Sequence, residues 1–332
     1  MSALSVSQHV DGVIARDRAI VAKTVTLVES TNEADRHAAR EVMRALAPHS
    51  GNARRIGVTG VPGAGKSTLL DAWGKRLLDT GARVAVLAVD PTSVVSGGSI
   101  LGDKTRMSYL SAHPNAFVRP SPSGLALGGV ARRTREAMLI CEAAGYEWMF
   151  VETVGVGQSE VAVSEMVDFF LVLAIAGAGD ELQGIKRGIF ELADAVLVHK
   201  SDGDNRARAQ VARAELQAAL RYAPRRNARW NAQVMTASSL TGEGLDELEA
   251  LVGRFFLEQA DWIDEQRKRQ LTLSMWRTAE QQLISSFRSD AATTELASEL
   301  SLALQARETS PEEAAALLCA RWIAANLPVP KK

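Results

Sequence analysis

Residues 60–67 read GVPGAGKS, a complete match to the phosphate-binding pattern GxxxxGK(S/T). The match stands between an apolar run that ends at Thr59 and a helix-like stretch that begins at Thr68. A strand, this loop and a helix in that order form the structural context in which the pattern binds nucleotide phosphates, whereas the pattern alone can arise by chance in a glycine-rich turn. The sequence therefore predicts a P-loop nucleotide-binding fold.

The chemistry of phosphate binding explains the residue types in this loop. Glycines let the backbone curl so that its N–H groups point inward, next to the positive end of the following helix. Lys66 can then reach the β- and γ-phosphates, which makes it a candidate catalytic residue, and the hydroxyl of Ser67 can hold Mg²⁺. The residues expected around the phosphates are Gly60, Val61, Pro62, Gly63, Ala64, Gly65, Lys66, Ser67 and Thr68.

Composition is ordinary for a globular protein and consistent with a cytoplasmic enzyme. The chain has 332 residues, of which 46% are hydrophobic and 23% are charged, and it carries a formal net charge of −1. This charge gives no reason to expect a nucleic-acid or membrane partner. Cys141 and Cys319 are the two cysteines, too few for a disulfide framework or a thiolate metal site. Because the N-terminal residues contain no long apolar run, we expect a cytoplasmic protein without a signal peptide.

Three regions differ in their sequence pattern. Residues 1–50 are predicted to form a helical extension, residues 51–256 a P-loop nucleotide-binding domain, and residues 257–332 a helical C-terminal region. In the middle region short apolar runs alternate with amphipathic segments, which predicts an α/β fold with a mostly parallel sheet. The predicted strands are 56–59, 84–89, 148–151, 169–175, 195–198 and 233–236, and the predicted C-terminal helices are 258–288 and 293–326.

The C-terminal region contains repeated leucines together with Trp262, Trp276 and Trp322, yet no strand pattern. Packing against the rest of the chain can account for some of these side chains. We expect the others to form the interface of a homodimer.

Carboxylates that follow predicted strands are candidate magnesium ligands, because ligands gather at the carboxyl ends of parallel strands. Asp90 directly follows the second strand, and Asp103 lies in the loop after it. Mg²⁺ prefers a few carboxylates together with retained waters. Both residues are therefore assigned to the metal site, and Asp103 also to the catalytic set.

The segment 152–158, ETVGVGQ, resembles the DxxG switch of GTP-binding proteins with Glu152 in place of the aspartate. By that resemblance Glu152 helps to fix the metal and Gly155 offers its N–H to the γ-phosphate, so both join the catalytic set. Val156 stands where many GTPases place a glutamine that orients water. Since a valine cannot orient water, we expect slow intrinsic hydrolysis. Gln158, two positions further on, is a candidate substitute for the glutamine that orients water in other GTPases.

Residues 199–202, HKSD, resemble the guanine signature NKxD with histidine in place of asparagine. A carboxylate at Asp202 can accept hydrogen bonds from N1–H and the exocyclic amine of guanine, whereas adenine lacks both donors. Lys200 can lie over the purine face, and the role of His199 is left open because imidazole cannot reproduce an amide. The loop SSLTGEG at 238–244 resembles the SA-type base loop, and its expected nucleotide contacts are Ser238, Ser239 and Leu240.

Four segments together resemble the MeaB/ArgK family of GTPases. They are DPTS at 90–93, SGGSILGDKTRM at 96–107, ETVGVGQSE at 152–160 and GAGDELQGIKRGIFELAD at 177–194. The resemblance covers nearly the whole chain, including both helical extensions.

This resemblance implies a homodimeric GTPase that uses GTP/GDP and Mg²⁺. It also implies a metallochaperone that binds adenosylcobalamin-dependent methylmalonyl-CoA mutase, gates cofactor loading, and protects or reactivates the mutase. Residues 177–194 match the additional switch of the family, which transmits the nucleotide state to the mutase.

Two other functions remain open from the sequence. One is a P-loop kinase that phosphorylates a transport component. The other is a nickel-delivery GTPase, which would normally carry clustered metal ligands. The histidines of this chain are dispersed, at positions His9, His37, His49, His113 and His199.

Overall fold

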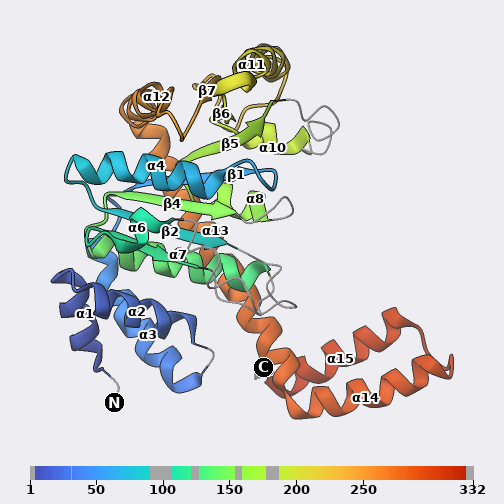
Figure 1. Ribbon diagram of the computed structural model, residues 1–332. Helices are drawn as coiled ribbons and strands as arrows, with labels where there is room; N and C mark the ends of the chain where they lie inside the picture. The colour runs from blue at the N-terminus through green and yellow to red at the C-terminus, as the bar shows by residue number, and fades with distance from the viewer. Residues whose placement is uncertain are drawn as a thin grey trace. The chain divides into compact units, whose positions relative to one another are not determined.

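The computed structural model describes residues 4–30, 32–89, 107–120, 127–153, 159–176 and 187–326 (Figure 1). The chain divides into two compact units, Met1–Gln270 and Leu271–Lys332. Each unit is described separately below.

A seven-stranded sheet forms the centre of the first unit. Its strands are β1 (Arg54–Gly60), β2 (Val84–Val89), β3 (Ala116–Arg119), β4 (Trp148–Thr153), β5 (Phe169–Ile175), β6 (Ala195–His199) and β7 (Gln233–Ala237). The strand order is β3-β2-β4-β1-β5-β6-β7, and every pairing is parallel. The predicted fold class is confirmed.

All six predicted strands are present, and the sequence prediction missed β3. This strand has only four residues, AFVR, and it ends in an arginine at the edge of the sheet. It therefore lacks the length of an apolar run that marks a buried central strand.

Helices lie on both faces of the sheet (Figure 1). Trp73 of the helix after β1 is fully buried, and its ring centroid lies 4.9 Å from that of Phe150 on β4. Such aromatic packing contributes a large apolar area to the core. The helices that connect the strands are α4 (Lys66–Asp79), α6 (Ser108–Ala112), α7 (Leu127–Ala143), α8 (Ser159–Ser164), α10 (Arg187–Leu192), α11 (Arg206–Leu220) and α12 (Leu245–Glu258), with a 3₁₀ turn η2 (Gly203–Asn205).

Three N-terminal helices also belong to the first unit, and they pack against one another and against α7. They are α1 (Val6–Ile14), α2 (Arg18–Glu29) and α3 (Glu33–Leu46), followed by the 3₁₀ turn η1 (Ala47–His49). Ser5 begins α1 with a capping box, in which its hydroxyl accepts from the backbone N–H of Gln8. Between the first two helices, His9 Nδ1 lies 2.8 Å from Thr24 Oγ1 in a buried contact.

The C-terminal helices are α13 (Ala260–Ser289), α14 (Ala291–Gln305) and α15 (Pro311–Asn326). The predicted single helix over 293–326 is therefore wrong, because it is two helices. Arg307 adopts a left-handed φ of 59°, and Pro311 opens the next helix, where its missing N–H costs nothing. Among the described residues, no helix combines the length and apolarity needed to cross a membrane.

A buried ion pair ties the amino edge of the sheet to α13. Asp168, whose side chain is fully buried, precedes β5, and its two carboxylate oxygens accept from Arg267 Nε at 2.8 Å and Nη2 at 2.6 Å. Arg267 also donates to the carbonyl oxygen of Ala53 at 2.6 Å, and Asp168 accepts from the backbone N–H of Arg55 at 3.0 Å. One guanidinium thus joins α13 to the segments that lead into β1 and β5.

Replacing Arg267 with alanine should lower the free energy of unfolding by about 3–5 kcal/mol, because it leaves the Asp168 carboxylate buried without its charged partner. Urea unfolding followed by circular dichroism measures this change. Arg269→Ala is the control, since the Arg269 side chain is 72% exposed and its pair with Glu265 spans 3.9 Å. The control should change the free energy by less than about 1 kcal/mol, and equal effects of the two variants would contradict the assignment.

Candidate nucleotide-binding site

The predicted P-loop connects the end of β1 to the start of α4, as its sequence context requires. Two of its glycines are fixed by both conformation and space. Gly60 has a φ of +151°, and a Cβ there would lie 2.4 Å from the carbonyl oxygen of Leu173. Gly65 has a φ of +86°, and a Cβ there would lie 2.7 Å from Nδ1 of His199. No larger residue fits at either position without movement of the backbone or of the buried imidazole.

Lys66 begins α4 and folds back over the loop. Its ammonium donates to the carbonyl oxygen of Gly60 at 2.8 Å, and the residue is only 8% exposed. The lysine is therefore held beside the concave side of the loop, where β- and γ-phosphates bind in P-loop proteins.

The next residue brings the first pair of predicted metal ligands together. The hydroxyl of Ser67 donates to Oε1 of Glu152 at 2.9 Å. Glu152 lies near the end of β4 and is 5% exposed, and its strand pairs with β1 so that Val58 lies opposite Glu152. A hydroxyl and a carboxylate are oxygen ligands of the type that Mg²⁺ prefers, so these two residues fit the predicted ion.

The remaining predicted phosphate and metal residues lie outside the described part of the chain. They are Asp90, Asp103 and Gly155, together with Val156 and Gln158. Their roles stay predictions.

The predicted base-binding residues meet at the carboxyl ends of β6 and β7. Oδ1 of Asp202 accepts from the hydroxyl of Ser238 at 2.6 Å, and that hydroxyl accepts in turn from the backbone N–H of Leu240 at 3.2 Å. Lys200 has a left-handed φ of 58°, and its carbonyl accepts from Asn205 Nδ2 at 2.7 Å. The loop after β7 thus orients the Asp202 carboxylate through Oδ1, and no described residue donates a hydrogen bond to its other oxygen.

His199 joins the phosphate loop to the base loop. Its ring is 2% exposed, with Nδ1 at 2.7 Å from the carbonyl oxygen of Ala64 and Nε2 at 2.7 Å from Oγ of Ser239. Burial lowers the pKa of His199, so the ring is neutral near pH 7. Because the Ala64 carbonyl can only accept, Nδ1 carries the proton and Nε2 accepts from the Ser239 hydroxyl.

Sequence reasoning left the role of His199 open and missed the hydroxyl of Ser239 as its partner. A signal was present, because the two motifs that resemble NKxD and SA depart from their patterns together. Histidine replaces the asparagine at 199, and serine replaces the alanine at 239. The structure shows that these two replacements supply the two halves of one buried hydrogen bond.

The chain is similar to several GTPases of one family. Residues 21–292 match the family model described as Methylmalonyl Co-A mutase-associated GTPase MeaB. A probable GTPase of Mycobacterium tuberculosis is 48% identical over 301 residues, which is 90% of each chain. GTPase ArgK of Escherichia coli is 51% identical over 232 residues, 70% of each chain. The methylmalonic aciduria type A homolog of Mus musculus, a mitochondrial protein, is 43% identical over 289 residues, covering 83% of this chain and 70% of the mouse protein.

A solved structure described as LAO/AO transport system kinase is similar in fold and sequence. It superposes with a TM-score of 0.75 at 34% identity, covering 96% of this chain and 99% of the other. The family model spans most of the chain, and the relatives named above exceed 40% identity over at least two thirds of it. The chain belongs to the MeaB/ArgK family of methylmalonyl-CoA mutase-associated GTPases.

Proposed function

We propose that this protein is a GTP-hydrolysing metallochaperone. It binds adenosylcobalamin-dependent methylmalonyl-CoA mutase, gates the loading of the cofactor, and protects or reactivates the mutase. The observation that carries the nucleotide part of the proposal is the connection of the P-loop to the Asp202 base loop through His199. The mutase part is supported by the family and by the similarity to the methylmalonic aciduria type A homolog. We also propose that the protein is cytoplasmic.

The chain's own residues divide the work of binding GTP with Mg²⁺. The P-loop N–H groups and Lys66 bind the phosphates, and Asp202 accepts from guanine. Ser67 and Glu152 would hold the magnesium ion, with Asp90 and Asp103 as further ligands. When bound, Mg²⁺ neutralises charge that develops on the phosphate oxygens.

Hydrolysis by the isolated protein should be slow. Val156 offers no polar group to orient the attacking water, so turnover is expected at roughly 10⁻⁴ to 10⁻² s⁻¹, the range of GTPases without an added catalytic group. A partner that completes the site would accelerate the reaction.

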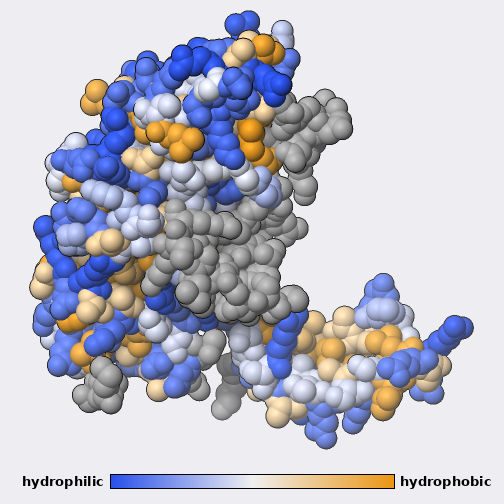
Figure 2. Space-filling view, in the orientation of Figure 1, coloured by the Kyte–Doolittle hydropathy of each residue, from blue (hydrophilic) through white to orange (hydrophobic). Residues whose placement is uncertain are grey.

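The second unit supports the proposal of a homodimer. Its described helices expose many large apolar side chains, and Figure 2 shows apolar surface on this unit. The exposed residues are Leu271, Leu273, Met275, Trp276, Leu283, Ile284, Leu302, Leu317 and Ile323. Apolar surface of this extent is typical of protein interfaces.

The dimer can be tested by light scattering at micromolar concentration. We expect twice the 35.6 kDa mass of one chain. Leu302→Glu places a charge on a side chain that is 68% exposed in this unit, and it should shift the mass toward the monomer. Leu257→Glu, at a side chain 81% exposed in the first unit, should leave the mass unchanged. A monomeric wild-type protein would refute the proposal.

One specific observation favours a second function, a kinase acting on a transport component. The solved structure at 34% identity is described as a transport system kinase. Transfer of labelled γ-phosphate to a protein or small molecule, rather than release to water, would establish this alternative.

The choice of guanine depends on Asp202. Asp202→Asn exchanges one acceptor for a donor, so it should weaken GTP binding about 10- to 100-fold and shift preference toward xanthosine triphosphate. Titration calorimetry with GTP and with xanthosine triphosphate measures the two affinities. Asp204→Asn, at an exposed position two residues further on, removes the same charge and should leave both affinities unchanged. Equal affinity of the wild-type protein for ATP and GTP would contradict the guanine assignment.

Coupling to the mutase is tested with two variants in the predicted switch. Lys186→Ala and Asp180→Ala, at positions outside the described residues, should keep GTP affinity, because binding energy comes mainly from the P-loop and Lys66. Both should lose the stimulation of hydrolysis by purified mutase, which is expected to be at least about tenfold in the wild type.

Stopped-flow hydrolysis with and without the mutase measures stimulation, and cobalamin absorbance measures cofactor transfer. Lys268→Ala on α13 removes a lysine that is 71% exposed outside the switch, and it should behave as the wild type. If the wild-type protein neither binds the mutase nor alters cofactor transfer, the proposed chaperone function is wrong. If the wild-type protein does act on the mutase and the two switch variants act on it equally well, the switch assignment is wrong.

A further inference from the structure

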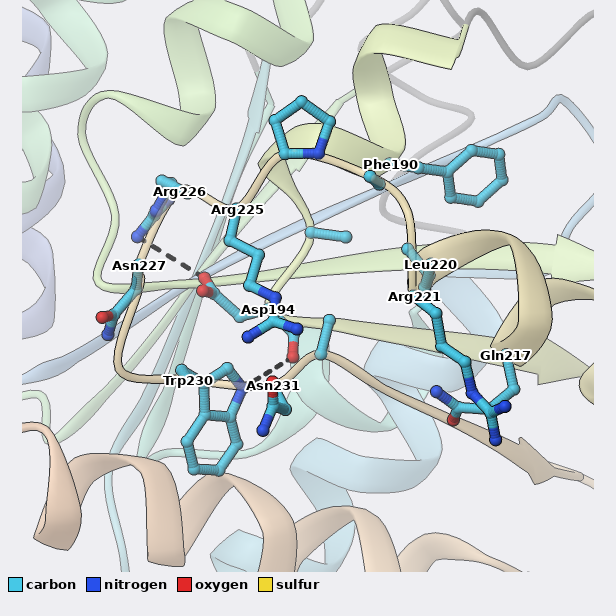
Figure 3. Close-up of a pocket in the computed structure, with 14 residues that line it drawn as sticks. Phe190, Asp194, Gln217, Leu220, Arg221, Arg225, Arg226, Asn227, Trp230 and Asn231 are labelled. Carbon is cyan, nitrogen blue, oxygen red and sulfur yellow. Dashed lines mark hydrogen bonds and ion pairs between the residues drawn. The ribbon is translucent and has the colours of Figure 1, made fainter.

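A cavity of about 140 Å³ opens at the edge of the sheet opposite the nucleotide site (Figure 3). It lies where β6 begins, between the end of α10, the end of α11 and the loop that leads to β7. Asp194 stands at its centre, directly before β6, whereas His199 ends the same strand at the nucleotide site. The cavity is therefore a separate site.

The Asp194 carboxylate is buried but incompletely paired. The side chain is 2% exposed, and Oδ2 accepts from the backbone N–H of Phe170 at 2.8 Å and lies 3.5 Å from Nη2 of Arg226. No described residue donates a hydrogen bond to Oδ1. Burial raises the pKa of Asp194 to about 6, so the group is mostly ionised at neutral pH and an added cationic partner would stabilise it.

Arg226 supplies that partner only in part, because both of its terminal nitrogens donate to the backbone and its nearest approach to the carboxylate is 3.5 Å. Nη1 donates to the carbonyl oxygen of Ser164 at 2.9 Å, and Nη2 donates to the carbonyl oxygens of Val167, at 3.3 Å, and Asp168. The terminal nitrogens of this guanidinium thus bind mainly backbone carbonyls that precede β5, and its buried Nε has no hydrogen-bond partner among the described residues. A buried carboxylate with one unpaired oxygen is a site for a donor group on a ligand.

Two other arginines bring positive charge to the cavity. Arg221 and Arg225 line it, both are exposed, and neither forms an ion pair or side-chain hydrogen bond with a described residue. The loop sequence 221–229, RYAPRRNAR, contains four arginines and no acid. Guanidinium groups of this kind recognise carboxylates through paired N–H donors.

The two kinds of charge together define the ligand. A simple anion would leave the free oxygen of Asp194 without a donor, and a simple cation would be repelled by the arginines. A zwitterion satisfies both, with its ammonium on the carboxylate and its carboxylate on the guanidinium groups. The apolar side of the cavity offers contact for a short hydrocarbon chain, and it is formed by Phe190, Leu220, Ala223 and Pro224.

We propose that this cavity binds a free α-amino acid with an aliphatic side chain, its ammonium group on Asp194 and its carboxylate on Arg221 and Arg225. The site is distinct from the nucleotide site and does not depend on the function proposed above.

The probe is L-leucine, added to the full-length protein in thermal-shift and calorimetric titrations. Isocaproate lacks the amine and isopentylamine lacks the carboxylate, so each presents only one of the two charges. We expect L-leucine to raise the melting temperature and to bind at least about tenfold more tightly than either analogue. Absence of any effect of L-leucine up to about 20 mM, or equal binding of either analogue, would overturn the proposal.

Single substitutions test which side chains bind L-leucine. Arg225→Gln should weaken L-leucine binding about tenfold or more, and this exposed position carries little risk to folding. Asp194→Asn should also weaken it, with unchanged GTP affinity as evidence that the protein remains folded. Arg208→Gln removes an exposed arginine on α11 that does not line the cavity, and it should leave binding unchanged. An equal loss in the Arg208 variant, or wild-type binding by the Arg225 variant, would overturn the assignment.

Discussion

The pairing of β1 with a parallel neighbour on each side is the constraint on which the rest of the structure depends. Val58 lies opposite Glu152 on β4 and Leu171 on β5, so the three strands end at one edge of the sheet. The hydrogen bonds between the strands satisfy the backbone polar groups in the buried centre of the sheet. Groups that can bind a ligand are therefore found where the strands end. The bond between Ser67 and Glu152 follows from this register, since α4 and the end of β4 are brought to the same point.

The two edges of the sheet carry different kinds of polar chemistry. At the carboxyl edge, His199 connects the P-loop and the base loop, where the nucleotide is proposed to bind. At the amino edge, Asp168 and Arg267 are fully engaged with each other and with the backbone, which makes them part of the framework. Asp194 on the same edge differs, because it is buried to a similar degree while one of its oxygens accepts no hydrogen bond from a described residue.

The sequence predicted those parts of the fold and site that depend on local pattern. Continuous apolar runs marked the six longer strands, and GVPGAGKS placed the phosphate loop between a strand and a helix. The four-residue strand β3 and the break between α14 and α15 carry weaker local signals, so the first was missed and the second was predicted as continuous helix. The contact between His199 and Ser239 joins residues that are distant in the chain, and only the tertiary arrangement of β6 and β7 reveals it. Asp90, Asp103 and Gly155 lie outside the described residues, and their roles remain predictions.

The hydrogen bond between His199 and Ser239 also limits the order in which a sequence of this kind can evolve. A serine can replace alanine at 239 while position 199 still holds asparagine, because a small hydroxyl beside a polar amide finds a partner. The reverse order passes through a chain whose imidazole nitrogen is buried against a methyl group, at a cost of about 1–3 kcal/mol. Most proteins have only 5–15 kcal/mol of stability to lose. The accessible mutational path therefore acquires the serine first, and on the way back Ser239 cannot be lost until His199 has been replaced.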